Sequence, residues 1–404
     1  MPKKIIICCD GTGNEIKENE SNVLKFYRLL KESAAQVAFY DPGVGTISNS
    51  GAWSTAKNKA KGVFGLATGY GLDANVLEAY RFLVRTYKPK DDIYLIGFSR
   101  GAHTVRVLAG FMNMVGVLRP HQEHLSSYAF TAYKQAGTKG EKGKNGDYDI
   151  AYKVQEVLDT FRPTIRFMGC WDTVASVIVP RADRLYLPAL EALPFTEKNP
   201  NVEFFRHAMA IDERRRMFRV SRWKSPQKFK PSPYMKEEDA GPQDIKQVWF
   251  AGVHSDIGGG YPESESGAAK FPLMWMVDEA RAQGLVFRET LVKRLVMGKN
   301  PKNVEAGSKR DYAAPDAQGP LHNSLRGPWK ILEYLPKRKK WHEDPTIRGS
   351  KGFYIPKAEM RHIPEGSIIH PSVFARIQAG DYNPPNLPND AKDIAVEDVS
   401  ADPK

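Results

Sequence analysis

Short apolar runs alternate with longer segments whose apolar residues recur at helical spacing, up to about residue 290. Each run ends at a polar or glycine-containing turn, and the runs occupy residues 5–9, 38–40, 92–97, 165–170 and 248–253. Runs of this length and composition are typical of strands that are buried on both faces of a sheet.

The intervening segments predict helices over residues 21–30, 73–87, 100–115 and 272–284. Ser21 and Asp73 are residue types that cap helix N-termini, and Pro272 and Gly284 fit the start and the end of the last helix. Strands that alternate with helices indicate an α/β fold. We therefore expect a mostly parallel sheet with helices on both faces.

The segment Gly97-Phe98-Ser99-Arg100-Gly101 lies where a predicted strand meets a predicted helix. It matches the G-x-S-x-G pattern, in which a serine sits on a strained strand-to-helix turn and only glycine tolerates the close approach on either side. Such a turn directs the hydroxyl out of the carboxyl edge of the sheet. Because a buried strand precedes the pattern and an amphipathic helix follows it, Ser99 is predicted to be a nucleophile on an α/β-hydrolase-like sheet.

A serine nucleophile needs a base and an acid that orients the base. In α/β-hydrolases the acid and then the histidine follow the serine, at the ends of later strands. Asp172 follows the run over 165–170 and His254 follows the run over 248–253, so Ser99, Asp172 and His254 keep this order. We predict that these three residues form a catalytic triad.

Other residues remain candidates for the same roles. Asp256 is a competing acid, and the competing bases are His207, His322 and His370. A histidine is commonly a hydrogen-bonded core residue, and an aspartate after a strand is often a turn or cap residue. The glycine run Gly258-Gly259-Gly260 predicts close packing against another element.

Backbone N–H groups near the nucleophile are candidates for an oxyanion hole. The Arg100 N–H opens the helix after Ser99, and Gly11 and Thr12 lie in the glycine-containing loop that closes the first strand. We predict that N–H groups of Arg100 and of the Gly11–Thr12 loop hold the oxyanion. Asp10 capping a plain turn is an alternative role for this loop.

Polar or glycine-rich stretches interrupt the α/β pattern and are interpreted as insertions at residues 43–72, 134–149 and 224–243. The region after residue 290 is basic and weakly periodic, and the end of the chain is rich in proline and aspartate. We expect three parts: a catalytic domain over 1–290, an extension packed on or capping it over 291–382, and a flexible tail over 383–404.

Composition narrows the function classes. The 404 residues are 41% hydrophobic and 26% charged, which excludes disorder of the whole chain, and 59 basic against 47 acidic residues give a net charge of +12. This charge suits anionic lipid headgroups or other acidic partners. The sequence carries no motif for binding nucleic acid, nucleotide or metal, so we expect neither these ligands nor a cofactor. The three cysteines form no C-x-x-C pair and are expected to be buried and reduced.

The sequence shows no signal peptide and no run of ~18 apolar residues that would span a membrane. We therefore expect synthesis in the cytoplasm, with any export through a system that does not read a signal peptide.

Several spaced motifs together resemble the DUF2235 family of α/β-hydrolases, whose bacterial members are similar to the catalytic domain of Tle1-type phospholipase effectors of type VI secretion. These motifs are CDGTGN (9–14), GFSRGAHTVRVLAG (97–110), WDTVAS (171–176), AIDERRRMF (210–218) and GVHSDIGGGY (252–261), with weaker matches at LHNS (321–324) and IHPSV (369–373). The resemblance places Ser99 at the nucleophile position of the family. It implies hydrolysis of ester bonds, with glycerophospholipid as the substrate in the effector branch.

The 404 residues are fewer than those of large effectors, and we expect no extended membrane-anchoring region among them. We expect a lipid or ester substrate. We also expect peripheral contact with anionic membrane surfaces through the basic segments at 43–72 and 134–149. The sequence does not decide whether a secretion or immunity partner exists. Two alternatives remain: an esterase of small molecules, and a non-catalytic module that binds acidic partners through its charge.

Overall fold

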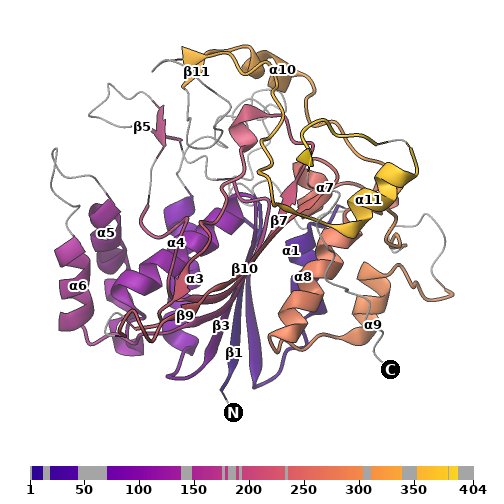
Figure 1. Ribbon diagram of the computed structural model, residues 1–404. Helices are drawn as coiled ribbons and strands as arrows, with labels where there is room; N and C mark the ends of the chain where they lie inside the picture. Colours follow the sequence, from indigo (N-terminus) through magenta and orange to yellow (C-terminus); the bar gives the residue numbers. More distant parts are fainter. Residues whose placement is uncertain are drawn as a thin grey trace, which may run out of the picture.

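The computed structural model describes residues 2–11, 19–43, 71–137, 148–174, 178–180, 188–190, 193–232, 235–303, 311–338, 353–380 and 382–389. Its centre is a seven-stranded sheet with helices on both faces (Figure 1). Every pair of neighbouring strands in this sheet is parallel. The expectation of a mostly parallel α/β sheet is therefore confirmed.

The order of strands across the sheet is β2-β1-β3-β4-β7-β10-β13. In chain order these strands are β1 (Lys4–Cys9), β2 (Gln36–Asp41), β3 (Asp92–Phe98), β4 (Ile165–Trp171), β7 (Val202–Ala210), β10 (Asp244–Phe250) and β13 (Ile368–Ile369). Three two-stranded antiparallel pairs lie outside the sheet: β5 (Ile178–Pro180) with β6 (Pro188–Leu190), β8 (Lys228–Phe229) with β9 (Gly241–Pro242), and β11 (Lys337–Arg338) with β12 (Phe353–Tyr354).

Helices α3 (Leu72–Thr86), α4 (Arg100–Val115), α5 (Ser126–Gly137) and α6 (Tyr148–Val157) cover one face of the sheet. Helices α1 (Asn22–Leu29), α8 (Lys270–Ala282) and α9 (Glu289–Leu291) cover the other. The other helices among the described residues are α7 (His254–Gly258), α10 (Pro328–Glu333) and α11 (Pro371–Gln378). The described residues also form the short 3₁₀ helices η1 (Pro120–Leu125), η3 (Arg216–Phe218) and η4 (Glu263–Glu265) and the π-helical η5 (Val292–Val296).

The first strand shows why the sheet is buried on both faces. Ile5, Ile7 and Cys9 pack in the core on the side of α3 and α4, while Ile6 and Cys8 pack on the side of α1 and α8. This alternation follows from the two-residue period of a strand. All three cysteines of the chain are free and buried, as expected.

Helix N-termini follow the sequence signals in part. The Ser21 hydroxyl accepts a hydrogen bond from the Leu24 N–H at 3.0 Å and caps α1, which confirms that prediction. The prediction for Asp73 is wrong, because α3 begins at Leu72 and Gly71 occupies the cap position. Asp73 lies instead in the first turn of α3, where a carboxylate is favoured by the helix dipole.

The regions predicted as insertions and extension differ in how they are built. Residues 44–70 and 138–147 lie outside the described residues, and the stretch 224–243 contains the β8–β9 hairpin. Residues after 290 add β13 to the edge of the main sheet beside β10. In the predicted tail, the Asn386 side-chain amide donates to the carbonyl of Ile211 at 3.1 Å, so this part is held on the domain.

Among the described residues, no helix is both long and apolar enough to cross a bilayer.

The contact between α4 and β1 requires a glycine. A Cβ atom on Gly101 would lie 2.1 Å from the carbonyl oxygen of Cys9, which is backbone and cannot move aside. We predict that Gly101→Ala lowers the free energy of unfolding by about 3 kcal/mol or more, measured by urea denaturation. Gly241→Ala is the control, because its Cβ would meet nothing within 4 Å, and it should change stability by less than about 0.5 kcal/mol. Equal stability of both variants would contradict the close packing of this turn.

Candidate active site

Ser99 occupies a strained turn between β3 and α4. Its backbone angles are φ 57° and ψ −119°, a conformation that is costly for a residue with a side chain. A Cβ on Gly97 would lie 2.6 Å from the Cα of Ala102, and Gly101 is held against β1 as described above. Both glycines of the G-x-S-x-G pattern are therefore required by packing, and the turn presents Ser99 beyond the end of β3.

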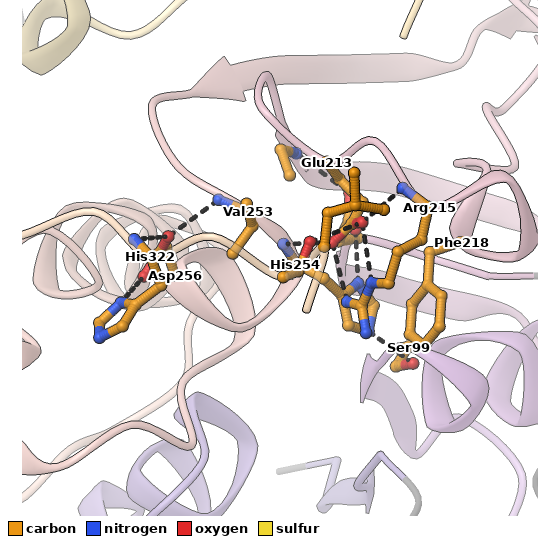
Figure 2. Close-up of polar contacts among 12 residues, drawn as sticks. Ser99, Glu213, Arg215, Phe218, Val253, His254, Asp256 and His322 are labelled. Atoms are coloured by element: carbon orange, nitrogen blue, oxygen red, sulfur yellow. Dashed lines mark hydrogen bonds and ion pairs between the residues drawn. The ribbon is translucent and has the colours of Figure 1, made fainter. Parts of the chain in front are cut away.

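The structure brings Ser99, His254 and Asp172 together, and Figure 2 shows Ser99 beside His254. The His254 Nε2 atom lies 2.8 Å from the Ser99 hydroxyl oxygen, and its Nδ1 atom lies 2.5 Å from Asp172 Oδ2. Asp172 directly follows β4, and His254 opens α7 shortly after β10. Because β3, β4 and β10 are parallel, their carboxyl ends meet at the same edge of the sheet, and all three side chains are buried there.

Arg361, from the segment before β13, completes the surroundings of Asp172. Its guanidinium donates to Asp172 Oδ1 at 2.6 Å and to Oδ2 at 2.9 Å, and also to the carbonyl of Ala210 at 2.9 Å. The Ala210 N–H donates to Asp172 Oδ1 at 3.0 Å. Arg361 is not among the residues predicted from the sequence, because a single arginine in a basic, weakly periodic segment carries no motif that would distinguish it.

These contacts set the charges of the site. Burial alone would raise the pKa of Asp172, but the Arg361 guanidinium and the hydrogen bond with His254 outweigh burial and hold the pKa below its ordinary value. Burial lowers the pKa of His254 below its ordinary value of 6.5, although Asp172 opposes this shift. The site therefore holds an ionised carboxylate beside a neutral imidazole at neutral pH, which is the arrangement that a general base requires.

Further side chains fix the position of His254. The backbone N–H of His254 donates to Glu213 Oε2 at 3.2 Å. The Glu213 carboxylate also accepts hydrogen bonds from the Arg215 guanidinium. The rings of Phe98 and Phe218 lie 4.6 and 5.0 Å from the imidazole, centroid to centroid. The AIDERRRMF motif, which the sequence analysis used only for the resemblance, thus supplies both a polar and an aromatic support for His254.

The glycine run after His254 explains how Phe98 reaches the imidazole. A Cβ on Gly258 would lie 2.0 Å from the Phe98 ring, so only glycine allows this contact, and the predicted close packing of the run is confirmed.

The competing candidates have other partners. Asp256 accepts from the Val253 N–H at 2.9 Å and pairs with His322 Nδ1 at 2.6 Å, and Figure 2 shows this pair on the far side of Val253 from Ser99. His207 Nε2 accepts from the Thr173 N–H at 3.1 Å. His370 caps α11 through Ser372. None of these contacts joins Asp256, His207, His322 or His370 to Ser99.

The predicted oxyanion donors have mixed outcomes. The Arg100 N–H opens α4 directly after Ser99, at a helix N-terminus where the dipole favours negative charge. The Gly11 N–H donates to Asp10 Oδ1 at 2.6 Å, which fits the alternative in which Asp10 caps this turn, and the role of Gly11 as an oxyanion donor stays a prediction. Thr12 lies outside the described residues. In the part of the chain that the structure describes, no group of three or more His, Cys, Asp and Glu side chains is placed to hold a metal ion.

A family model described as "T6SS, Phospholipase effector Tle1-like, catalytic domain" matches residues 3–279. The chain belongs to this Tle1-like family. The match covers β1 to most of α8, including Ser99, Asp172 and His254, and ends before Arg361.

This Tle1-like chain is also similar to individual proteins, at 17–31% sequence identity. It is 31% identical over 244 residues to an uncharacterized protein of Saccharomyces cerevisiae, YEL023C, across 58% of this chain and 33% of that protein. A crystal structure of an uncharacterized Pseudomonas aeruginosa protein is 18% identical (TM-score 0.38; 71% of this chain, 46% of that one). A Tle1 effector bound to the VgrG spike of the type 6 secretion system is 17% identical (TM-score 0.34; 65% and 52%). The chain thus spans about a third to a half of these proteins.

The link between Arg361 and the Asp172–His254 pair predicts a titration effect. In Arg361→Met the positive charge beside Asp172 is lost, so the imidazolium of His254 is less disfavoured and the pKa of His254 should rise by about one pH unit. An NMR titration of the His254 Cε1–H signal measures this shift. Arg361→Lys keeps the charge and should move the midpoint of the His254 titration less. In Arg361→Met, loss of the paired arginine should also lower the free energy of unfolding by about 3–5 kcal/mol.

The matched control for this titration is Arg376→Met. Arg376 is also a buried arginine of the C-terminal segment, but it donates to the carbonyls of Ala317 and Gly319. Its loss should leave the His254 midpoint unchanged. An unchanged midpoint in Arg361→Met as well would show that Arg361 only supports the fold.

Proposed function

We propose that this protein is a serine hydrolase that cleaves carboxylic ester bonds of glycerophospholipids through an acyl-Ser99 intermediate. The observation that carries the proposal is the buried hydrogen-bonded chain Ser99–His254–Asp172 at the carboxyl edge of the sheet. Membership of a family described as phospholipase effectors supports lipid as the substrate class.

The first step is attack by Ser99. As its hydroxyl oxygen bonds to the ester carbonyl carbon, the proton passes to His254 Nε2, and the carbonyl oxygen becomes an oxyanion beside the Arg100 N–H. Asp172 accepts a hydrogen bond from the Nδ1–H of His254. Its negative charge stabilises the imidazolium, and the proton stays on the nitrogen. The carbon–oxygen bond to the alcohol then breaks, and His254 returns the proton to the leaving alcohol.

The second step releases the fatty acid. Water attacks the acyl carbon while His254 removes its proton, and the bond to Ser99 breaks with return of that proton to the serine oxygen. No cofactor enters either step.

Partners and location follow from the same family membership. We infer a secretion-system partner and export that does not depend on a signal peptide, because the family is described by type VI secretion. The net charge of +12 suits contact with anionic membrane surfaces.

Removal of the nucleophile tests the proposal directly. Ser99→Ala should lower kcat/KM for phospholipid vesicles and for a soluble ester by about 10³-fold or more, with unchanged urea denaturation. The matched control is Ser372→Ala, because the Ser372 hydroxyl also lies 2.8 Å from a histidine ring nitrogen, that of His370, and should leave turnover unchanged. A fluorophosphonate probe should label the wild type and not Ser99→Ala. Undiminished hydrolysis in Ser99→Ala would defeat the assignment, and a chain that neither turns over nor labels would be a binding module.

The pKa of His254 predicts the pH profile of turnover. The base acts only when neutral, and burial lowers its pKa below 6.5, so kcat/KM should stay high at pH 6.5 and fall as pH decreases below that value. The profile of kcat/KM on a soluble ester between pH 4 and 8 measures this limb. A midpoint at or above pH 7 would contradict the assignment of His254 as the base.

A further inference from the structure

Helix α10 is fastened to the candidate active site by its inward face. The Trp329 ring packs edge to face on Phe218, with centroids 5.4 Å apart, and Phe218 in turn lies against His254. Glu333 is fully buried and accepts a hydrogen bond from the Arg216 N–H at 2.8 Å. A single side chain, Phe218, therefore separates Trp329 of α10 from the imidazole. The helix lies beyond the carboxyl edge of the sheet (Figure 1).

The exposed side of α10 and of the residues directly after it carries apolar side chains. Ile331 lies on α10, Tyr334 is its C-cap and Leu335 follows, and these side chains are 69%, 62% and 46% exposed. Ile355 is 45% exposed and lies beside the same segment, because β11 pairs with β12 in the register Lys337 to Tyr354. We call Ile331, Tyr334, Leu335 and Ile355 the α10 patch.

Clustering distinguishes this patch from scattered surface residues. Of the nine large apolar side chains that are exposed among the described residues, four lie within residues 331–355. Single exposed apolar residues are common, whereas a group rimmed by polar residues marks an interaction site.

The charges around the α10 patch are positive. Arg326, Lys330 and Lys357 are exposed beside it. In residues 326–338 and 353–360 the acidic side chains are Glu333 and Glu359; the first is buried, and the second forms an ion pair with Arg219. An apolar face with a basic rim is complementary to an anionic bilayer, in which side chains enter the acyl boundary and cations contact headgroups.

We propose that the α10 patch docks this protein on anionic phospholipid bilayers and thereby brings the lipid to Ser99. The proposal rests on the proposed phospholipase function for its substrate, but docking itself requires no turnover. A bilayer fits better than a protein partner, because the patch adjoins the wall of the site that a membrane lipid has to enter. In the described residues of its rim, the exposed charged side chains named above are all positive.

Binding is tested in the Ser99→Ala background, so that no lipid is hydrolysed. Ile331→Ser with Tyr334→Ser should weaken co-sedimentation with phosphatidylglycerol–phosphatidylcholine vesicles by about tenfold or more. The matched control is Tyr128→Ser with Val157→Ser, a tyrosine and a β-branched residue that are 63% and 79% exposed on α5 and α6. This control pair should bind as the parent does, and urea denaturation checks that both double variants are folded.

Charge and turnover give two further measurements. Arg326→Gln with Lys330→Gln should weaken binding to anionic vesicles and reduce its salt dependence, with little effect on pure phosphatidylcholine vesicles. With Ser99 present, Ile331→Ser with Tyr334→Ser should lower the ratio of activity on vesicles to activity on a soluble ester.

Each outcome bears on docking separately from catalysis. Failure of the parent to bind vesicles, or equal binding by the patch and control variants, would overturn the docking proposal while leaving the role of Ser99 intact. A concentration-dependent dimer that only the patch variant loses, with vesicle binding unchanged, would assign the patch to a second copy of the chain instead. Loss of hydrolysis without loss of binding in Ser99→Ala is the expected result.

Discussion

Asp172 is a buried carboxylate shared between the imidazole of His254 and the guanidinium of Arg361. Burial of an unpaired charge costs several kcal/mol, so an ionised Asp172 depends on both partners and on the Ala210 N–H. The carboxylate in turn fixes the orientation of His254 and the tautomer in which its Nε2 atom faces Ser99. The ends of β4 and β10 and the segment before β13 must therefore converge on a single side chain.

Backbone constraints bring the other half of the site to the same place. Ser99 is held in a strained conformation between two glycines that are packed against backbone, so the hydroxyl has little freedom to turn away. Gly258 admits the Phe98 ring, which lies on one side of His254, and Phe218 lies on another. These contacts hold Ser99 and His254 in the mutual orientation that the proposed mechanism requires, without any ligand present, as in a preorganised site.

The sheet and the order of Ser99, Asp172 and His254 could be predicted from the sequence, because strands buried on both faces and the G-x-S-x-G turn leave local signals. The predicted cap of α3 lies two positions from the observed one, since Gly71 and Asp73 both fit a helix start. Arg361 and the α10 patch could not be predicted. Both belong to a C-terminal region whose helices and strands are short, and the contacts that place them join residues far apart in the chain.

Arg361 also bears on what counts as an autonomous folding unit. The region shared with the Tle1-like family ends at residue 279, whereas β13 and Arg361 lie beyond it. A fragment cut at that boundary would expose β10 as an edge strand and leave Asp172 without its cation. The buried Asp172 carboxylate would then lose the guanidinium that neutralises it, and burial of an incompletely paired charge costs several kcal/mol. We therefore expect the smallest piece of this chain that keeps the Ser99–His254–Asp172 arrangement to include the C-terminal segment with Arg361.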